Sequence, residues 1–207
     1  MALSKKALQA KREKKKKKRV VKLSRPGTVA IAYNNWPIYE CWVPNSLFEM
    51  GMGQILIARQ NDLGDFAVGI YLVDSYCLGI KDCVVHLVDL FDYREILEGI
   101  EEVGGEMERV DPTYANTLIH KAILYAQQFG FKPHEDFSKT KNFLKNIPID
   151  ESQEFNFGKD GKPLYIPGPY DSHAKVMKIM QALNLDLSND MGTSDYLIED
   201  PESILLT

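Results

Sequence analysis

The order of local patterns along the chain limits its fold most strongly, because strand-forming runs come first and helical spacing follows. The strand-forming runs are rich in β-branched and aromatic residues, and they occupy residues 28–33, 38–43, 53–58, 66–73 and 84–88. Turn-forming residues at 34–35 and 60–65 separate the first two pairs of runs, which favours antiparallel hairpins. In the run 66–73 both alternating faces are apolar, as expected for a central strand that is covered on each side.

In the second half of the chain, apolar residues recur at the spacing of helices. Asp111 and Pro112 form an N-cap followed by a first-turn proline, and apolar residues then recur at helical spacing until Gly130. Weaker helical patterns cover 89–103, 135–145 and a stretch that Asp171 is placed to cap. Runs at 155–157 and 164–166 flank Asp160 and Gly161, a pair typical of tight hairpin turns.

Strands followed by helices predict an α+β fold. We expect an antiparallel sheet of four to five strands, with helices packed on one face and a late β-hairpin. The predicted divisions are a disordered lysine-rich arm at residues 1–25, a single α+β domain at 26–187 and a loose acidic tail at 188–207.

The arm, residues 1–25, differs from the rest of the chain in charge. It holds twelve basic side chains and one acidic side chain, a balance of +11, whereas residues 26–207 hold 13 basic and 28 acidic ones, a balance of −15. A cationic arm on an anionic body predicts a polyanionic partner that contacts the arm alone.

We therefore expect an intracellular nucleic-acid-binding or ribosome-associated protein, which contacts RNA or the ribosome through residues 5–25. The acidic body would be a protein-interaction or RNA-associated module. The expected nucleic-acid-binding residues are the densest basic ones, Lys11, Arg12, Lys14, Lys15, Lys16, Lys17, Lys18 and Arg19. The same run would also suit a targeting signal, an anionic lipid surface or a solubilising tail, and the sequence does not decide among these.

A metal-dependent nuclease is the alternative function. Asp74 ends the apolar run 66–73, and a carboxylate at such a strand end can hold Mg²⁺. Glu40 is the preferred companion carboxylate, Asp82, Asp89 and Asp171 are further options, and His120 is the candidate general base. The competing interpretation gives these residues no catalytic role: Asp74 forms hydrogen bonds with the turn at Ser75, and His120 is a surface residue. Whether any reaction is catalysed stays undecided.

The sequence favours no other cofactor. Cys77, Cys83 and His86 lack the paired spacing and the fourth ligand of a zinc site, so we expect buried thiols and no bound metal. His134 and Asp136 are interpreted as the start of a helix. Phosphate-binding, dinucleotide-binding, zinc-protease and serine-hydrolase motifs are not found.

The expected location is the cytoplasm. An odd number of cysteines, three, suggests a reducing compartment. The basic N-terminal segment is not followed by the apolar run of a signal peptide, and no run of eighteen apolar residues predicts a membrane span.

Overall fold

A computed structural model describes residues 33–168 and 171–184 of the chain. Its centre is a five-stranded sheet with the strand order β4-β3-β2-β1-β5, in which every neighbouring pair is antiparallel. The strands are β1 (Ile38–Pro44), β2 (Met52–Gln60), β3 (Phe66–Asp74), β4 (Gly79–Val88) and β5 (Met107–Val110). The predicted α+β class is confirmed.

The hairpin predicted around residues 60–65 is present. Gln60 of β2 pairs with Phe66 of β3, and the side chain of Asn61 accepts hydrogen bonds from the backbone N–H groups of Leu63 and Asp65, at 3.0 and 2.8 Å. An asparagine that closes its own loop in this way is typical of turns.

The start of the described chain differs from the predicted hairpin at 28–43. Residues 28–32 lie outside the described part, and Tyr33 begins a short 3₁₀ helix, η1 (Tyr33–Asn35), instead of ending a strand. β1 pairs with β2 on one side and with the unpredicted strand β5 on the other. Only four residues long, β5 carries too short a pattern to be recognised in the sequence.

The helices of the first part of the fold are α2 (Leu47–Met50), α3 (Leu90–Gly104), α4 (Pro112–Gln128), α5 (Phe137–Thr140) and the 3₁₀ helix η2 (Lys141–Leu144). Helix α4 begins at its predicted cap, whereas the sequence did not predict α2. Asp111 caps α4 by accepting a 2.7 Å hydrogen bond from the N–H of Thr113. Asp89 caps α3 through the N–H of Asp92 at 3.1 Å.

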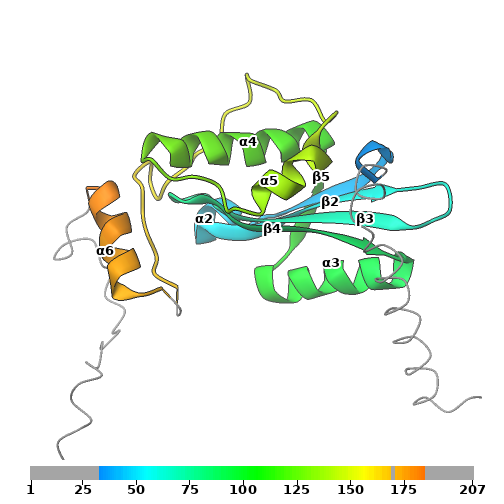
Figure 1. The fold of residues 1–207 in the computed structure, drawn as a ribbon, viewed down its shortest axis with the longest axis horizontal. Helices are drawn as coiled ribbons and strands as arrows, with labels where there is room; N and C mark the ends of the chain where they lie inside the picture. The colour runs from blue at the N-terminus through cyan, green and yellow to red at the C-terminus, as the bar shows by residue number, and fades with distance from the viewer. Residues whose placement is uncertain (1–32, 169–170, 185–207) are drawn as a thin grey trace, which may run out of the picture. The chain divides into compact units, whose positions relative to one another are not determined.

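Helices cover both faces of the sheet, which corrects the expected arrangement on one face. Figure 1 shows α4 and α5 on one side of the sheet and α3 on the other. On the α4 side, Ala67 and Tyr71 of β3 join the larger core cluster, whereas Phe66 and Val68 join a smaller one with Tyr93 of α3. Two covered faces explain why β3 is apolar on both sides.

The predicted late hairpin forms only its turn. Lys159 and Lys162 make an isolated β-bridge, and Asp160 and Gly161 between them have positive φ angles of 52° and 77°. No strand forms at 155–157 or 164–166. Phe155 stacks on Phe48 and Phe157 on Tyr125 of α4, so ring packing takes the place of backbone pairing.

The chain divides by its contacts into two units, with the boundary after Leu164. In the second unit, α6 (His173–Ala182) is capped by Ser172, not by the predicted Asp171. Asp171 instead accepts hydrogen bonds from the hydroxyl of Tyr165 and the N–H of Gly168, at 2.6 and 2.8 Å. The predicted arm and tail lie outside the described residues. No helix in the described part is long and apolar enough to cross a membrane.

Candidate functional site

The eight basic residues expected to bind nucleic acid, from Lys11 to Arg19, lie outside the described residues. The candidate catalytic residues Asp74, Glu40 and His120 all lie within them.

Asp74 organises the turn between β3 and β4. Its side chain is almost fully buried, and Oδ1 accepts hydrogen bonds from the backbone N–H groups of Tyr76, Cys77 and Leu78 at 3.0, 2.9 and 3.3 Å. Burial raises the pKa of this carboxyl above its ordinary value, although the three N–H groups and nearby Lys81 oppose that shift. This is the structural role that the sequence suggested as an alternative to metal binding.

Glu40 lies far from Asp74 along the sheet. Glu40 pairs with Ala58 of β2, and Ala58 pairs with Val68 of β3, six positions before Asp74. At about 3.3 Å per residue the two carboxylates are roughly 20 Å apart. Glu40 accepts a hydrogen bond from the hydroxyl of Tyr93 and lies 3.6 Å from Nε of Arg109. The structure therefore does not bring the proposed metal pair together.

His120 lies on α4, half-buried at the edge of a hollow of about 450 Å³ between that helix and the segment 137–149. The other lining residues are apolar, amide or lysine side chains, among them Asn116, Lys141 and Lys145. Because no described residue lining this hollow carries a carboxylate, nothing there orients His120 as a general base.

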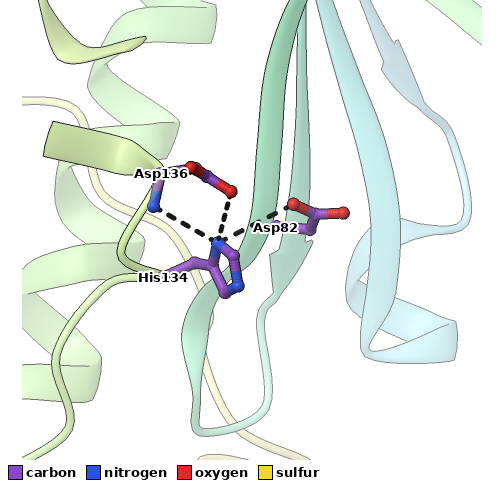
Figure 2. Close-up of side chains that lie close together, drawn as sticks. All are labelled: Asp82, His134 and Asp136. Carbon is purple, nitrogen blue, oxygen red and sulfur yellow. Dashed lines mark hydrogen bonds and ion pairs between the residues drawn. The ribbon is translucent and has the colours of Figure 1, made fainter. Parts of the chain in front are cut away.

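A different set of residues comes together at the outer edge of the sheet. Asp82 of β4, His134 of the loop after α4 and Asp136 before α5 place one imidazole nitrogen and two carboxylate oxygens within 4.8 Å of one another. We call these three residues the Asp–His–Asp cluster. Figure 2 shows both carboxylates on the Nδ1 side of the imidazole ring.

The position of β4 explains how the cluster forms. β4 is an edge strand, so its outer side is open to pairing. The backbone N–H of His134 donates a 2.9 Å hydrogen bond to the carbonyl of Ile80, which docks the loop against this edge. The histidine then lies beside Asp82, two residues further along the same strand.

The distances within the cluster are longer than direct hydrogen bonds. Nδ1 of His134 is 3.8 Å from Oδ1 of Asp82 and 3.6 Å from Oδ2 of Asp136. The backbone N–H of Asp136 donates a long 3.4 Å hydrogen bond to the same nitrogen. The side chains of His134 and Asp136 are 37% and 35% exposed and that of Asp82 is 64% exposed, so the cluster opens to solvent.

The second oxygen of Asp136 is already engaged. Oδ1 accepts a hydrogen bond from Nζ of Lys139 one turn later. This hydrogen bond, together with the positive charge of Lys139, lowers the pKa of the Asp136 carboxyl below its ordinary value. Asp136 therefore keeps its negative charge at neutral pH and leaves Oδ2 facing the histidine.

The other residues considered for metal binding have different surroundings. Cys77 and Cys83 are buried free thiols, as expected, and burial raises the pKa of both. Cys83 faces the interior of the fold, where its Sγ contacts the Thr140 hydroxyl at 3.2 Å, whereas His86 on the same strand is exposed. Of the further carboxylates, Asp89 and Asp171 serve the local contacts described above.

In the sequence, Asp82 is one of several candidate carboxylates, whereas His134 and Asp136 read as a helix start, and no local signal links them. Fifty-two positions separate Asp82 from His134, and neither spacing nor composition indicates that a loop will dock on the edge strand. The hydrogen bond from His134 N–H to the carbonyl of Ile80 in β4 brings them together, and it depends on tertiary structure.

Comparison with known proteins gives no match: no family model, no curated protein and no solved structure is similar to the chain.

Proposed function

We propose that this protein binds RNA, alone or within the ribosome, through the basic arm, and that the acidic body is a module for protein interaction. The separation of charge, +11 in residues 1–25 and −15 in the remainder, carries the proposal. Each cation that meets a phosphate releases condensed counterions, which gives affinity without sequence recognition.

The surface of the body supports this division of roles. Helix α3 exposes Glu95, Glu98, Glu101 and Glu102. These carboxylates repel phosphate from the α3 side, which directs a polyanion towards the arm. An exposed acidic surface of this kind suits a partner with basic side chains.

The nuclease alternative has less support from the geometry. Asp74 faces three backbone N–H groups, and Glu40 lies roughly 20 Å away at the other end of the strands. Both proposed metal ligands of the nuclease contact other groups of the protein, so RNA binding by the arm is the stronger proposal.

The test is RNA affinity measured as a function of salt. A single-stranded RNA should bind the full chain with a steep dependence on salt, and a chain lacking residues 1–25 should lose that dependence. Replacing Lys14 to Lys18 and Arg19 with glutamine removes six positive charges. The slope of the logarithm of the RNA-binding constant against the logarithm of the salt concentration should then become shallower by about 4, at roughly 0.7 per phosphate contact.

The matched control changes charge on the body alone. Replacing the four exposed α3 glutamates with glutamine raises the net charge by four, whereas the arm variant lowers it by six; because the control leaves the arm intact, its slope should stay the same. A slope that survives deletion of the arm would overturn the proposal.

A further inference from the structure

We propose that the Asp–His–Asp cluster, Asp82, His134 and Asp136, binds one divalent transition-metal ion such as Zn²⁺ at the outer edge of β4. This inference is independent of RNA binding, because it depends only on described residues of the body.

The donor atoms determine the class of ion. One imidazole nitrogen with two carboxylate oxygens suits Zn²⁺, Mn²⁺, Co²⁺ and Ni²⁺. Mg²⁺ and Ca²⁺ prefer shells made of oxygen alone, and Cu⁺ prefers sulfur ligands. The cluster therefore favours a first-row divalent ion over the Mg²⁺ that the alternative nuclease function would require.

The separations are close to those that a metal requires. Two ligands about 2.0 Å from a tetrahedral zinc ion are about 3.3 Å apart. The observed distances from Nδ1 are 3.6 Å to Asp136 and 3.8 Å to Asp82. The two carboxylate oxygens lie within 4.8 Å of each other, and a rotation of the 64% exposed Asp82 side chain would shorten its distance to the imidazole.

Neighbouring groups already orient the ligands. The 2.9 Å hydrogen bond from His134 N–H to Ile80 fixes the histidine backbone, and the N–H of Cys83 donates to Oδ1 of Asp82 at 2.7 Å. Lys139 holds Oδ1 of Asp136 and leaves Oδ2 facing the imidazole. Contacts of this kind strengthen metal sites by orienting the first ligands.

The exposure of the cluster determines the type of site. Three protein ligands open to solvent leave at least one coordination position for water, whereas structural zinc sites have four protein ligands. The ion would therefore carry an exchangeable water ligand.

A salt bridge is the competing explanation, because a protonated histidine between two carboxylates would have the same arrangement. The two explanations differ in one measurable respect: only a metal site binds Zn²⁺ at one ion per chain, with an affinity that depends on all three side chains.

The experiment is isothermal titration of Zn²⁺ into the full, untagged, chelator-treated chain. We expect one ion per chain, and at least tenfold weaker binding after His134→Ala or Asp82→Asn. Asp82→Asn keeps the shape of an exposed side chain, so the fold should survive it, and circular dichroism checks this. His86→Ala, which removes an exposed histidine from the same strand, is the matched control and should bind as the unmodified chain does.

Cobalt gives a second readout, since Co²⁺ bound through nitrogen and oxygen ligands has visible absorption that reports its coordination. This absorption should appear with the unmodified chain and disappear in both cluster variants. The proposal is overturned if the unmodified chain binds no Zn²⁺, or if the cluster variants bind it as tightly as the His86 control.

Discussion

The carboxylate of Asp74 is surrounded by hydrogen-bond donors yet has little access to water. Three backbone N–H groups of the β3–β4 turn converge on Oδ1. They satisfy the oxygen, but burial still raises the pKa of the carboxyl. Asp74 therefore acts as the hydrogen-bond acceptor of the turn, and burial disfavours its charged form.

Two substitutions distinguish how much the hydrogen-bond acceptor of Asp74 and how much its charge contribute to stability. Asp74→Ala leaves three backbone donors without their acceptor and should lower the free energy of unfolding by about 2–4 kcal/mol. Asp74→Asn keeps the acceptor oxygen and removes the buried charge, so its stability at pH 7 should equal or exceed that of the unmodified chain. Urea unfolding measures both, and equal losses in the two variants would contradict this account.

The raised pKa of Asp74 also predicts a pH dependence. A carboxyl with a raised pKa in the folded state adds stability below its unfolded pKa of about 3.9, and this contribution is lost as pH rises through the folded value. The unmodified chain should therefore lose stability relative to Asp74→Asn as pH rises above about 4. Unfolding curves of the two chains across this range provide the test.

Arg59 is a second buried charged residue, and it donates hydrogen bonds to backbone carbonyls. Its side chain, 4% exposed, donates to the carbonyls of Trp36 at 2.7 Å, Phe143 at 2.9 and 3.2 Å, and Lys145 at 3.1 Å. It thereby ties β2 to both 3₁₀-helical regions.

Replacing Arg59 with lysine should be costly although the charge is kept. One ammonium group cannot reach the three carbonyls that the guanidinium spans, so we expect a loss of about 2–4 kcal/mol in the free energy of unfolding. Arg94→Lys, at an exposed position on α3, is the control and should change stability by less than about 0.5 kcal/mol. Similar values for the two variants would contradict the role given to Arg59.

At the scale of elements, close packing between β3 and η2 depends on a glycine. A Cβ atom added at Gly69 of β3 would lie 2.7 Å from the ring of Phe143, whereas one added at Gly99 of α3 would have no neighbour within 4 Å. The aromatic ring of η2 thus packs directly against the strand backbone.

The same substitution should therefore have opposite effects at these two glycines. Gly69→Ala forces the Phe143 ring to move and should destabilise the fold by about 1–3 kcal/mol. Gly99→Ala should stabilise it by about 0.5–1 kcal/mol, because alanine has the higher helix propensity. Thermal unfolding of both variants measures the difference, and a neutral Gly69→Ala would show that Phe143 can move freely.

The elements that could be predicted from sequence are those with strong local signals. Asp111 with Pro112 marks the start of α4, and the turn-forming segment 60–65 marks the β2–β3 hairpin. The predicted turn at Asp160 forms, but the flanking strands at 155–157 and 164–166 do not, because Phe155 and Phe157 pack against other rings and that packing depends on tertiary contacts. The same limit applies to the Asp–His–Asp cluster, which forms only when the loop bearing His134 docks on β4.

On the scale of the whole molecule, net charge alone gives a misleading picture of how the chain meets its partners. The total of −4 is the small remainder of two large opposite charges, one confined to residues 1–25. The Debye length is about 10 Å at 0.1 M salt, so charges separated by more than this act almost independently. A polyanion should therefore respond to the arm, and a polycation to the body.

Ion exchange at pH 7 tests this independence without any assumption about the biological ligand. At about 0.1 M salt, where the Debye length is about 10 Å, the full chain should bind both a cation exchanger and an anion exchanger, in spite of its sequence pI of about 5.6. Removing residues 1–25 should abolish binding to the cation exchanger and raise the salt needed for elution from the anion exchanger. Failure of the full chain to bind the cation exchanger would mean that the body neutralises the arm, and the RNA proposal would lose its electrostatic basis. Binding to the resin without binding to RNA would instead show that an accessible positive charge is insufficient for RNA binding.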